Sequence, residues 1–335
     1  PALLRAFWVA LAGRLPRKSN EKFRHGLSVL DPTCGSGAFL FAALQILKPL
    51  YQACLTAMSG LVVDAYINPK PDLTPPNLPL SGEASRQASS PPLSRGARGI
   101  GVALEDFEEI VDRFNAAGTD LQCDYAVLKQ IIVYNLYGVD IEAQATEIAK
   151  LRLFLKLVAL LEPGDVIEPL PDIDFNIRAG NTLVGYASAA ETERAVHGAE
   201  QVNLFTDAWD DIRISLTAVE QAYNNFQIQQ VQRGGHVTAE DKRALHDQLG
   251  ELEETLNGHL CREYGKNPKK PTEYKAWKDS HKPFHWYVDF YPIMASGGFD
   301  VVIGNPPYVQ LSEVKEYTFR NYSCTASGNP YGLIF

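Results

Sequence analysis

The chain has 335 residues, of which 45% are hydrophobic, which is enough apolar material for one large core or two smaller ones. A formal net charge of -9 argues against a chain that binds nucleic acid through its overall charge, so phosphate contacts require a local basic patch. The five cysteines form no Cys-x-x-Cys pair, so the composition indicates neither a zinc site nor a disulfide framework, and we expect a cytoplasmic location.

The chain shows no signal peptide, and we expect no apolar run long enough to span a membrane. It begins at Pro1, without a methionine, and ends on the apolar residues YGLIF. We therefore expect that both ends are cut and that the chain is a fragment.

The first third of the chain predicts two helices around one strand. Residues 1–15 suit an amphipathic helix, 27–31 a short strand and 37–58 a long apolar helix. The stretch that follows is rich in Pro, Ser, Gly and Arg, so we expect a disordered insertion over 68–103. A passive loop is the favoured interpretation of this insertion, and a binding role of its own is the alternative.

The rest of the chain continues the alternation of strands and helices. Residues 104–115 and 124–135 predict helices, 136–140 a second strand, 142–161 a long helix, and 175–186 contain a third strand. Two polar helices then predict a helical insertion, and an apolar run at Phe299–Ile303 predicts a buried fourth strand. This rhythm is typical of an α/β fold with a parallel sheet and right-handed crossovers. The expected segments are 1–67, 68–103, 104–187, 188–285 and 286–335.

Unusual residues follow the predicted strands, at the end where ligands bind in such sheets. After the first strand, DPTCGSGAF places an acceptor at Asp31, and Gly35 and Gly37 allow a tight turn and a close backbone approach to a ligand. The spacing fits neither a Walker loop nor the dinucleotide fingerprint, and a simple turn explains the pattern as well.

The next two strand ends carry residues with two interpretations each. Asp140 suits the hydroxyls of a ribose, or the N-cap of the following helix. Ile141 suits the face of a purine, or the core. Asn181 suits the edge of an adenine, or a turn.

After the fourth strand comes GNPPY, which predicts a rigid loop. The side-chain oxygen of Asn305 and the carbonyl of Pro306 are suitable acceptors for the two hydrogens of an exocyclic amine on a base. Such acceptors favour a pyramidal nitrogen with a free lone pair, and Tyr308 can stack on the base. The alternative is a proline-stiffened turn with a surface tyrosine.

Together, DPTCGSGAF, GVDI, AGNTL and GNPPY occur in order at successive strand ends. This set resembles the adenine-N6 DNA methyltransferases of the large bacterial restriction-modification and phage-defence type. The resemblance covers about 25–65, 120–187 and 280–335, and includes LRLFLKLV and FHWYVDF.

The resemblance implies a Rossmann-like methyltransferase fold, incomplete at its C-terminus, with S-adenosyl-L-methionine as methyl donor and no metal. The residues that it assigns to the donor are Asp31, Pro32, Gly35 and Gly37 for the methionine end, Asp140 and Ile141 for the ribose and purine, and Asn181 near the adenine. Those that it assigns to the target adenine are Asn305, Pro306, Pro307 and Tyr308. Its implied partners are double-stranded DNA and a nuclease or specificity domain in the same parent chain.

Two other interpretations stay open. A protein methyltransferase that acts on a glutamine amide also uses an Asn-Pro-Pro-Tyr loop. An inactive, truncated remnant is the second alternative. The basic stretch 266–282 either contacts DNA phosphates or forms a solvated face.

Overall fold

The computed structural model describes residues 2–13, 26–67, 100–115, 119–162, 170–199, 208–231 and 237–306. Most of the predicted insertion at 68–103 and everything beyond Pro306 therefore lie outside the described residues. The division of the chain into five segments stays a prediction.

A parallel sheet stands at the centre of the described chain. Its four strands are β1 (Val29–Asp31), β2 (Leu136–Asp140), β3 (Ile177–Ala179) and β4 (Val301–Val302), in the spatial order β3-β2-β1-β4. All three neighbouring pairs are parallel. The order reverses at β1, as in doubly wound folds, so a ligand crevice is expected at the carboxyl ends of β1 and β4. The predicted Rossmann-like α/β class is confirmed. The prediction that the fourth strand is buried is wrong, because β4 is the edge strand of the described sheet and both Val301 and Val302 are exposed.

Helices connect and cover these strands. Those before the third strand are α1 (Ala2–Ala12), α2 (Ala38–Ile67), α3 (Ile100–Asn115), α4 (Asp120–Tyr134) and α5 (Ala143–Val158). Those after it are α6 (Ala189–Ala199), α7 (Ala208–Val231), α8 (Ala239–Glu263), α9 (Pro271–His281), α10 (Trp286–Asp289) and α11 (Tyr291–Ala295).

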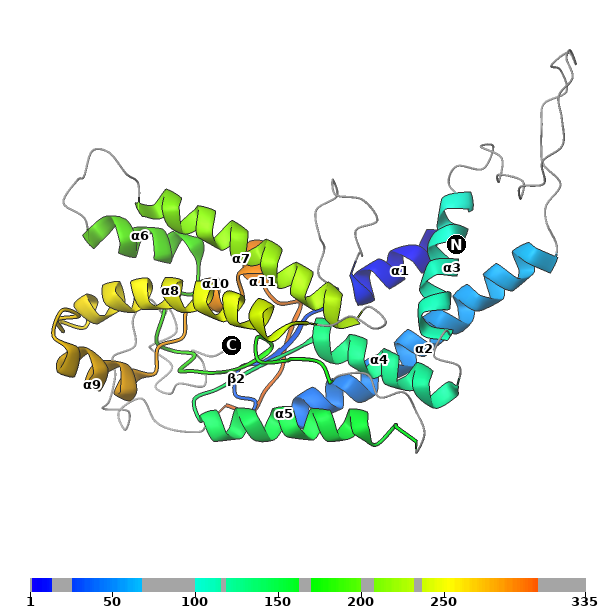
Figure 1. Ribbon diagram of the computed structural model, residues 1–335, viewed down its shortest axis with the longest axis horizontal. Helices are drawn as coiled ribbons and strands as arrows, with labels where there is room; N and C mark the ends of the chain where they lie inside the picture. The colour runs from blue at the N-terminus through cyan, green and yellow to red at the C-terminus, as the bar shows by residue number, and fades with distance from the viewer. Residues whose placement is uncertain are drawn as a thin grey trace, which may run out of the picture.

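Successive residues of a strand point to opposite faces of the sheet, so both faces carry apolar side chains, and both are covered. Val29 and Leu136 face a core made with α1 to α5, whereas Leu30 and Tyr137 face Phe284 and other residues near α10 and α11. Figure 1 shows this layering, with α5 on one side of the sheet and α10 and α11 on the other.

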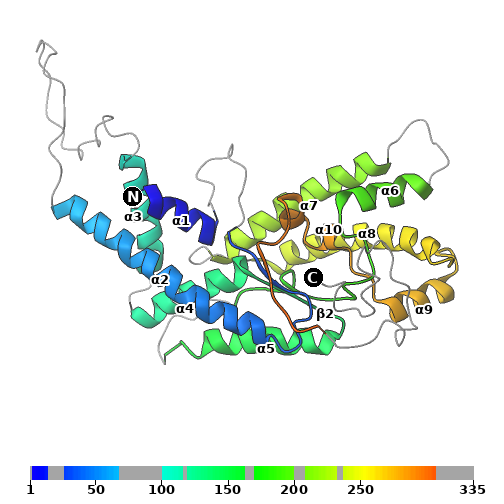
Figure 2. The same cartoon turned by 180° about the vertical axis from the view of Figure 1, so that it is seen from behind.

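The helices α6 to α9, here called the α6–α9 body, pack through an apolar cluster that includes Leu216, Leu249 and Leu256. Phe175 and Val184, which flank β3, belong to the same cluster. In Figure 1 and from behind in Figure 2, α6, α8 and α9 gather at one end of the molecule and α1 to α3 at the other. The helix α9 lies at the end of the molecule where α5 begins, which is the carboxyl end of β2.

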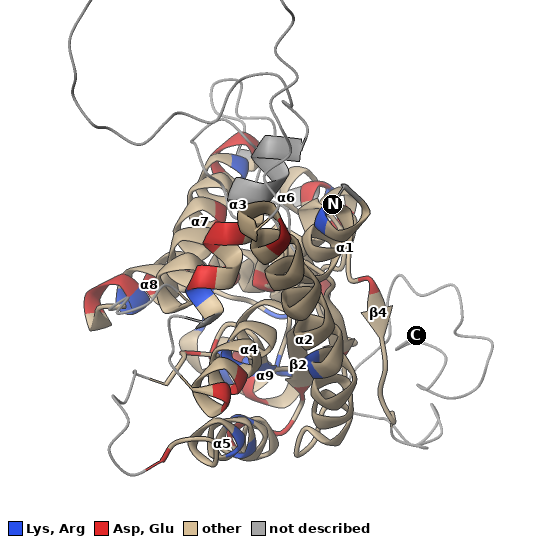
Figure 3. Ribbon diagram, turned by 90° about the vertical axis from the view of Figure 1, so that its right-hand side faces the viewer, with Lys and Arg blue, Asp and Glu red and all other residues tan. Residues whose placement is uncertain are grey.

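The helix α2 departs from the sequence expectation. By length and composition alone it is apolar enough to cross a membrane, and Figure 3 draws it almost entirely in tan because it carries few charges. One face of α2 is nevertheless buried against β1, β2, α3 and α4. Its buried Tyr51 hydroxyl donates to the side-chain oxygen of Asn135 at 2.8 Å. Of its apolar window, 33% is buried inside the protein, and a single helix of this length and composition is weak evidence for a membrane span.

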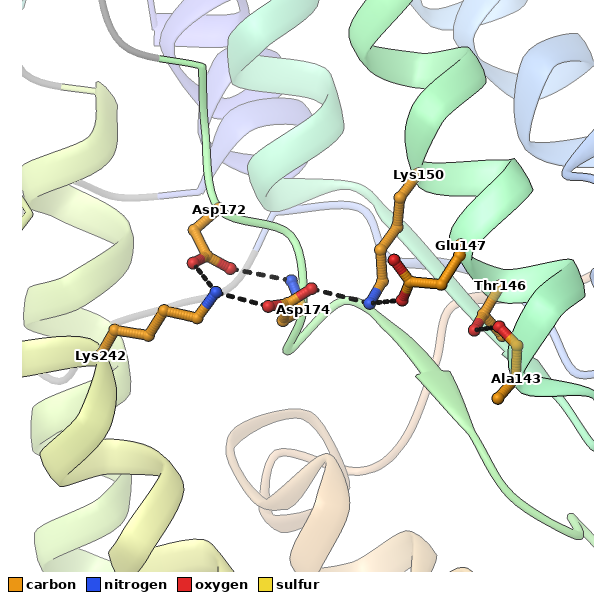
Figure 4. Close-up of polar contacts among 7 residues, drawn as sticks. All are labelled: Ala143, Thr146, Glu147, Lys150, Asp172, Asp174 and Lys242. Atoms are coloured by element: carbon orange, nitrogen blue, oxygen red, sulfur yellow. Dashed lines mark hydrogen bonds and ion pairs between the residues drawn. The ribbon is translucent and has the colours of Figure 1, made fainter. Parts of the chain in front are cut away.

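Ion pairs join the α6–α9 body to the sheet domain (Figure 4). Lys242 of α8 contacts the carboxylates of Asp172 and Asp174, which precede β3. Asp174 also accepts from Lys150 of α5 at 2.7 Å, and Lys150 in turn pairs with Glu147. Burial opposes ionisation of Asp174, but the hydrogen bonds from Lys150 and Lys242 outweigh it and lower its pKa to about 2. This short, charged segment is one tie between the two bodies, and the pair between Arg178 of β3 and Glu253 of α8, at 2.6 Å, is another.

Candidate active site

The end of β1 holds a buried carboxylate. Asp31 is fully buried, and its Oδ1 accepts the backbone N–H of Thr33 at 3.1 Å. Its Oδ2 and the Thr33 hydroxyl are both buried without a hydrogen-bond partner. Burial raises the pKa of Asp31 to about 6; the Thr33 N–H opposes this shift and the nearby Asp140 adds to it. Because buried polar atoms normally have partners, this pair indicates a place for a polar ligand group.

The glycine turn after β1 is built by backbone conformations that favour glycine. Gly35 and Gly37 have φ of 50° and 81°, and the Gly37 N–H donates to the Cys34 carbonyl at 2.7 Å. Arg152 of α5 donates to the Ser36 carbonyl at 2.7 Å and lies over the ring of Phe41. The turn predicted from Gly-Ser-Gly is present, and an arginine that the sequence did not single out braces it.

Asp140 at the end of β2 is linked to this turn. One oxygen accepts the Gly35 N–H at 2.8 Å, and the other accepts the Glu142 N–H at 2.9 Å. The N-cap of α5 is Glu142, so the interpretation of Asp140 as the cap is wrong. The side chain of Ile141 is 39% exposed, so it is not a core residue either. Both residues therefore stand at the surface of the strand ends, where a ligand can reach them.

Asn181 follows β3, and the two polar atoms of its side chain differ in their contacts. Its side-chain oxygen accepts the Leu183 N–H at 3.1 Å, which is the turn interpretation. Its side-chain nitrogen is buried without a hydrogen-bond partner. A buried N–H₂ that lacks an acceptor is a donor held ready for a ligand atom.

The loop after β4 passes directly over Asp31. The Ile303 N–H donates to the Leu30 carbonyl at 2.8 Å, which continues the pairing of β4 with β1. A Cβ atom on Gly304 would lie 2.7 Å from Oδ1 of Asp31, so only glycine allows this approach. Asn305 is exposed and Pro306 is buried. Pro307 and Tyr308 lie outside the described residues.

The remaining candidates from the sequence are the basic stretch 266–282 and a metal site. In the basic stretch 266–282, Trp277 is buried and the Tyr274 hydroxyl donates to Glu254 at 2.5 Å, so both rings pack on α8. Among the described residues, no group of three or more His, Cys, Asp and Glu side chains is placed to hold a metal ion. The close approach of Gly304 to Asp31 and the role of Arg152 were missed, because neither is visible in local sequence patterns.

The chain matches known proteins over most of this site. Residues 134–333 match the model of the Eco57I restriction-modification methylase family, which includes Asp140, Asn181 and the GNPPY loop but not the glycine turn. The chain is 31% identical over 229 residues to a Methanocaldococcus jannaschii protein whose name describes a type II restriction enzyme and methyltransferase.

That alignment covers 54% of this chain and 18% of the relative, so the chain spans less than a fifth of its length. No solved structure matches the chain. The family match covers more than half of the chain, and it agrees with the parallel α/β sheet. The chain belongs to the Eco57I restriction-modification methylase family.

Proposed function

We propose that this chain carries the donor-binding and catalytic part of a DNA methyltransferase that modifies N6 of a flipped adenine. The observation that carries the proposal is the convergence of Asp31, Asp140 and the Asn305 loop at one edge of the parallel sheet, where Gly35 donates to Asp140 and Gly304 touches Asp31. Ligands bind at this edge in doubly wound folds.

The polar groups at this edge fit S-adenosyl-L-methionine as the donor. Oδ2 of Asp31 lacks a partner and suits the ammonium of the methionine end, beside the turn formed by Pro32, Gly35 and Gly37. Both oxygens of Asp140 already accept one backbone N–H, and each keeps a second lone pair for a ribose hydroxyl.

Two described residues are candidates for contacts with the purine ring of the donor. The exposed side chain of Ile141 suits one face of the ring, and the unpartnered Nδ2 of Asn181 suits an acceptor nitrogen on its edge. The donor, when bound, supplies a methyl group on a sulfonium, which leaves as a thioether when the methyl is transferred.

The loop after β4 supplies the groups for the target base. The Asn305 side chain is exposed at the strand end, and its oxygen and the Pro306 carbonyl accept the two hydrogens of the adenine amine. The lone pair of that nitrogen would then be free to attack the methyl carbon in line with the departing sulfur, and the methylated nitrogen would lose one proton to water. Pro307 stiffens the loop, and Tyr308 stacks on the extruded base, an interaction worth roughly 1–3 kcal/mol.

The match to a restriction-modification methylase family supports a role in a restriction-modification system, and we propose this role or one in phage defence. The relative from Methanocaldococcus jannaschii is named as both restriction enzyme and methyltransferase. We therefore propose double-stranded DNA as substrate, a nuclease or specificity domain in the same parent protein, and action in the cytoplasm.

The test is Asn305→Ala in the protein expressed from the complete reading frame that contains this sequence. We expect methyl transfer from labelled donor to DNA to fall by at least ~10²-fold, because one preorganised acceptor is lost. The affinity for the donor, measured by calorimetry, should stay unchanged.

Asn225→Ala is the matched control, because Asn225 is an exposed asparagine on α7, outside the proposed site. A normal rate in Asn305→Ala would show that the amine contact is wrong. Labelling of a release factor in place of DNA would favour the glutamine-amide alternative, and failure to bind the donor would favour the inactive remnant.

A further inference from the structure

The segment Lys282–His285, between α9 and α10, lies against the loop that follows β3. The Asn181 N–H donates to the Lys282 carbonyl at 2.7 Å, and the Phe284 N–H donates to the Val184 carbonyl at 2.7 Å. Asn181 and Pro283 form an isolated parallel bridge. The end of the α6–α9 body is therefore built into the edge where the donor is proposed to bind.

Lys282 has an unusual backbone for a lysine. It is the C-cap of α9 with φ of 45° and ψ of 55°, and no other residue except glycine has a positive φ in the described part of the chain. Glycine or asparagine normally occupies this left-handed position after a helix. A lysine here adds strain that glycine would avoid, which indicates that its side chain has a use.

The lysine side chain reaches the loop after β2. Its Nζ donates to the Ile141 carbonyl at 3.1 Å and pairs with Oε1 of Glu142 at 3.0 Å. Lys282 thus contacts two strand-end loops at once, with its carbonyl on Asn181 and its ammonium on Ile141. The exposed ion pair with Glu142 contributes little by itself, and the hydrogen bond to the Ile141 carbonyl, also exposed, is the contact that reaches the backbone of the loop after β2.

We propose that Lys282 is a positioning residue for the nucleoside half of the donor. It holds the backbone of Ile141 and the turn of Asn181 at a fixed separation, and the purine is proposed to lie between these residues. This inference rests on the proposed function, because it takes the donor site as given. It assigns a binding role to the C-cap of α9, which approaches the site from the helical body.

The experiment measures donor affinity by calorimetry in Lys282→Gly and Lys282→Met, again in the protein from the complete reading frame. We expect the dissociation constant for S-adenosylmethionine to rise roughly 3- to 10-fold in both, as the loss of one ordinary hydrogen bond implies. Lys282→Gly relieves the left-handed backbone, so its thermal stability should equal or exceed that of the natural protein. A purely structural role predicts no loss of affinity in this variant.

Two comparisons show whether the loss of affinity arises at the nucleoside half of the donor and from Lys282 itself. 5′-Methylthioadenosine keeps the ribose and purine but lacks the amino-acid end, so Lys282→Met should weaken it by the same factor as the full donor. Lys278→Met is the matched control, because Lys278 lies on α9 and its ammonium pairs with Glu254 of α8, away from the strand-end loops. It should bind both ligands normally.

Unchanged affinity in both Lys282 variants, together with weaker binding in Asp140→Ala, would overturn the inference and leave the donor site in place. Unchanged affinity in Asp140→Ala as well would remove the proposed donor site itself. Weakening of the full donor but not of 5′-methylthioadenosine would also overturn the inference, because the effect would then lie at the methionine end.

Discussion

At the scale of single residues, the buried carboxylate of Asp31 lowers the stability of the folded chain. A fully buried carboxylate with one unpartnered oxygen destabilises the folded chain, and nothing in the described protein offsets it beyond the Thr33 N–H. The ammonium of the donor would supply the missing partner. On the proposed assignment of the donor site, Asp31 couples the pH dependence of folding to that of donor binding.

The residue-scale prediction is that Asp31→Asn stabilises the fold and weakens donor binding. Asp31 releases its proton near pH 3.8 in the unfolded chain but at about 6 in the folded chain. Between these values the unfolded state binds fewer protons, so the contribution of Asp31 to stability falls as the pH rises. Above that window the ionised form destabilises the fold by about 3 kcal/mol.

Urea unfolding should therefore show the variant more stable than the natural protein at about pH 7.5, by up to about 3 kcal/mol, and nearly equal at about pH 3.5. Its affinity for S-adenosylmethionine should fall roughly 10-fold or more, because a charged hydrogen bond is lost. A variant that is less stable at neutral pH would contradict the assignment of Asp31 as a buried, uncompensated charge.

At the scale of elements, the loop after β3 and the Lys282–His285 segment form one unit. They exchange backbone hydrogen bonds, and the Trp286 side chain donates to the Thr182 carbonyl at 3.0 Å. Two stretches of the sequence about 100 residues apart, AGNTLVG and FHWYVDF, are thus halves of the same structure. The two stretches, which both belong to the resemblance found in the sequence, therefore form a single structural unit.

The element-scale prediction is that Gly185→Ala breaks this unit. A Cβ atom at Gly185 would lie 1.9 Å from the Phe284 carbonyl oxygen, so the two segments must separate. We expect the free energy of unfolding to fall by roughly 2–4 kcal/mol, measured by urea unfolding. Gly250→Ala in α8 is the control: its Cβ would meet no atom within 4 Å, and it should raise stability by ~0.5–1 kcal/mol. An equal response of the two variants would mean that the segments are not packed together.

At the scale of the whole molecule, the α6–α9 body is held to the sheet domain partly by charge. Lys242 contacts Asp172 and Asp174, and Asp174 also contacts Lys150, so one segment links α8 with α5 (Figure 4). The depressed pKa of Asp174 contributes stability above about pH 3.8, and this is lost as the pH falls toward about 2. Arg178 of β3 also pairs with Glu253 of α8 at 2.6 Å, and the Lys282 contact adds a further link at the opposite end of β3.

The whole-molecule prediction is that Lys242→Met loosens this link. We expect a loss of about 1 kcal/mol in the free energy of unfolding at neutral pH and low salt, because the pairs are partly exposed. The loss should shrink at about 1 M salt, where the Debye length is about 3 Å, and vanish near pH 2. Lys270→Met, which removes an exposed pair with Glu273 on α9, should change stability little. A loss that is independent of both salt and pH would assign Lys242 a packing role instead.

Local pattern predicted the four strands and most of the long helices in their order, but not α6, α9, α10 and α11, and not the exposure of β4. The predicted strand at 136–140 is β2 to the residue, and the predicted helix at 142–161 is α5 within three residues at its C-terminal end. Period-2 and period-3.6 patterns and turn-forming glycines act over a few residues, so a single sequence contains them. The parallel sheet followed from their alternation.

Contacts between distant residues were decided by the tertiary structure alone. The approach of Gly304 to Asp31, the reach of Lys282 to Ile141 and the bracing of Ser36 by Arg152 each join residues more than 100 positions apart. The apolar helix α2 is likewise assigned to the core only by what packs on it. The sequence by itself determined which residues stand at the strand ends, because strand and turn preferences are local. Which of them touch, and which polar atoms are left without partners, depended on how the sheet brings those ends together.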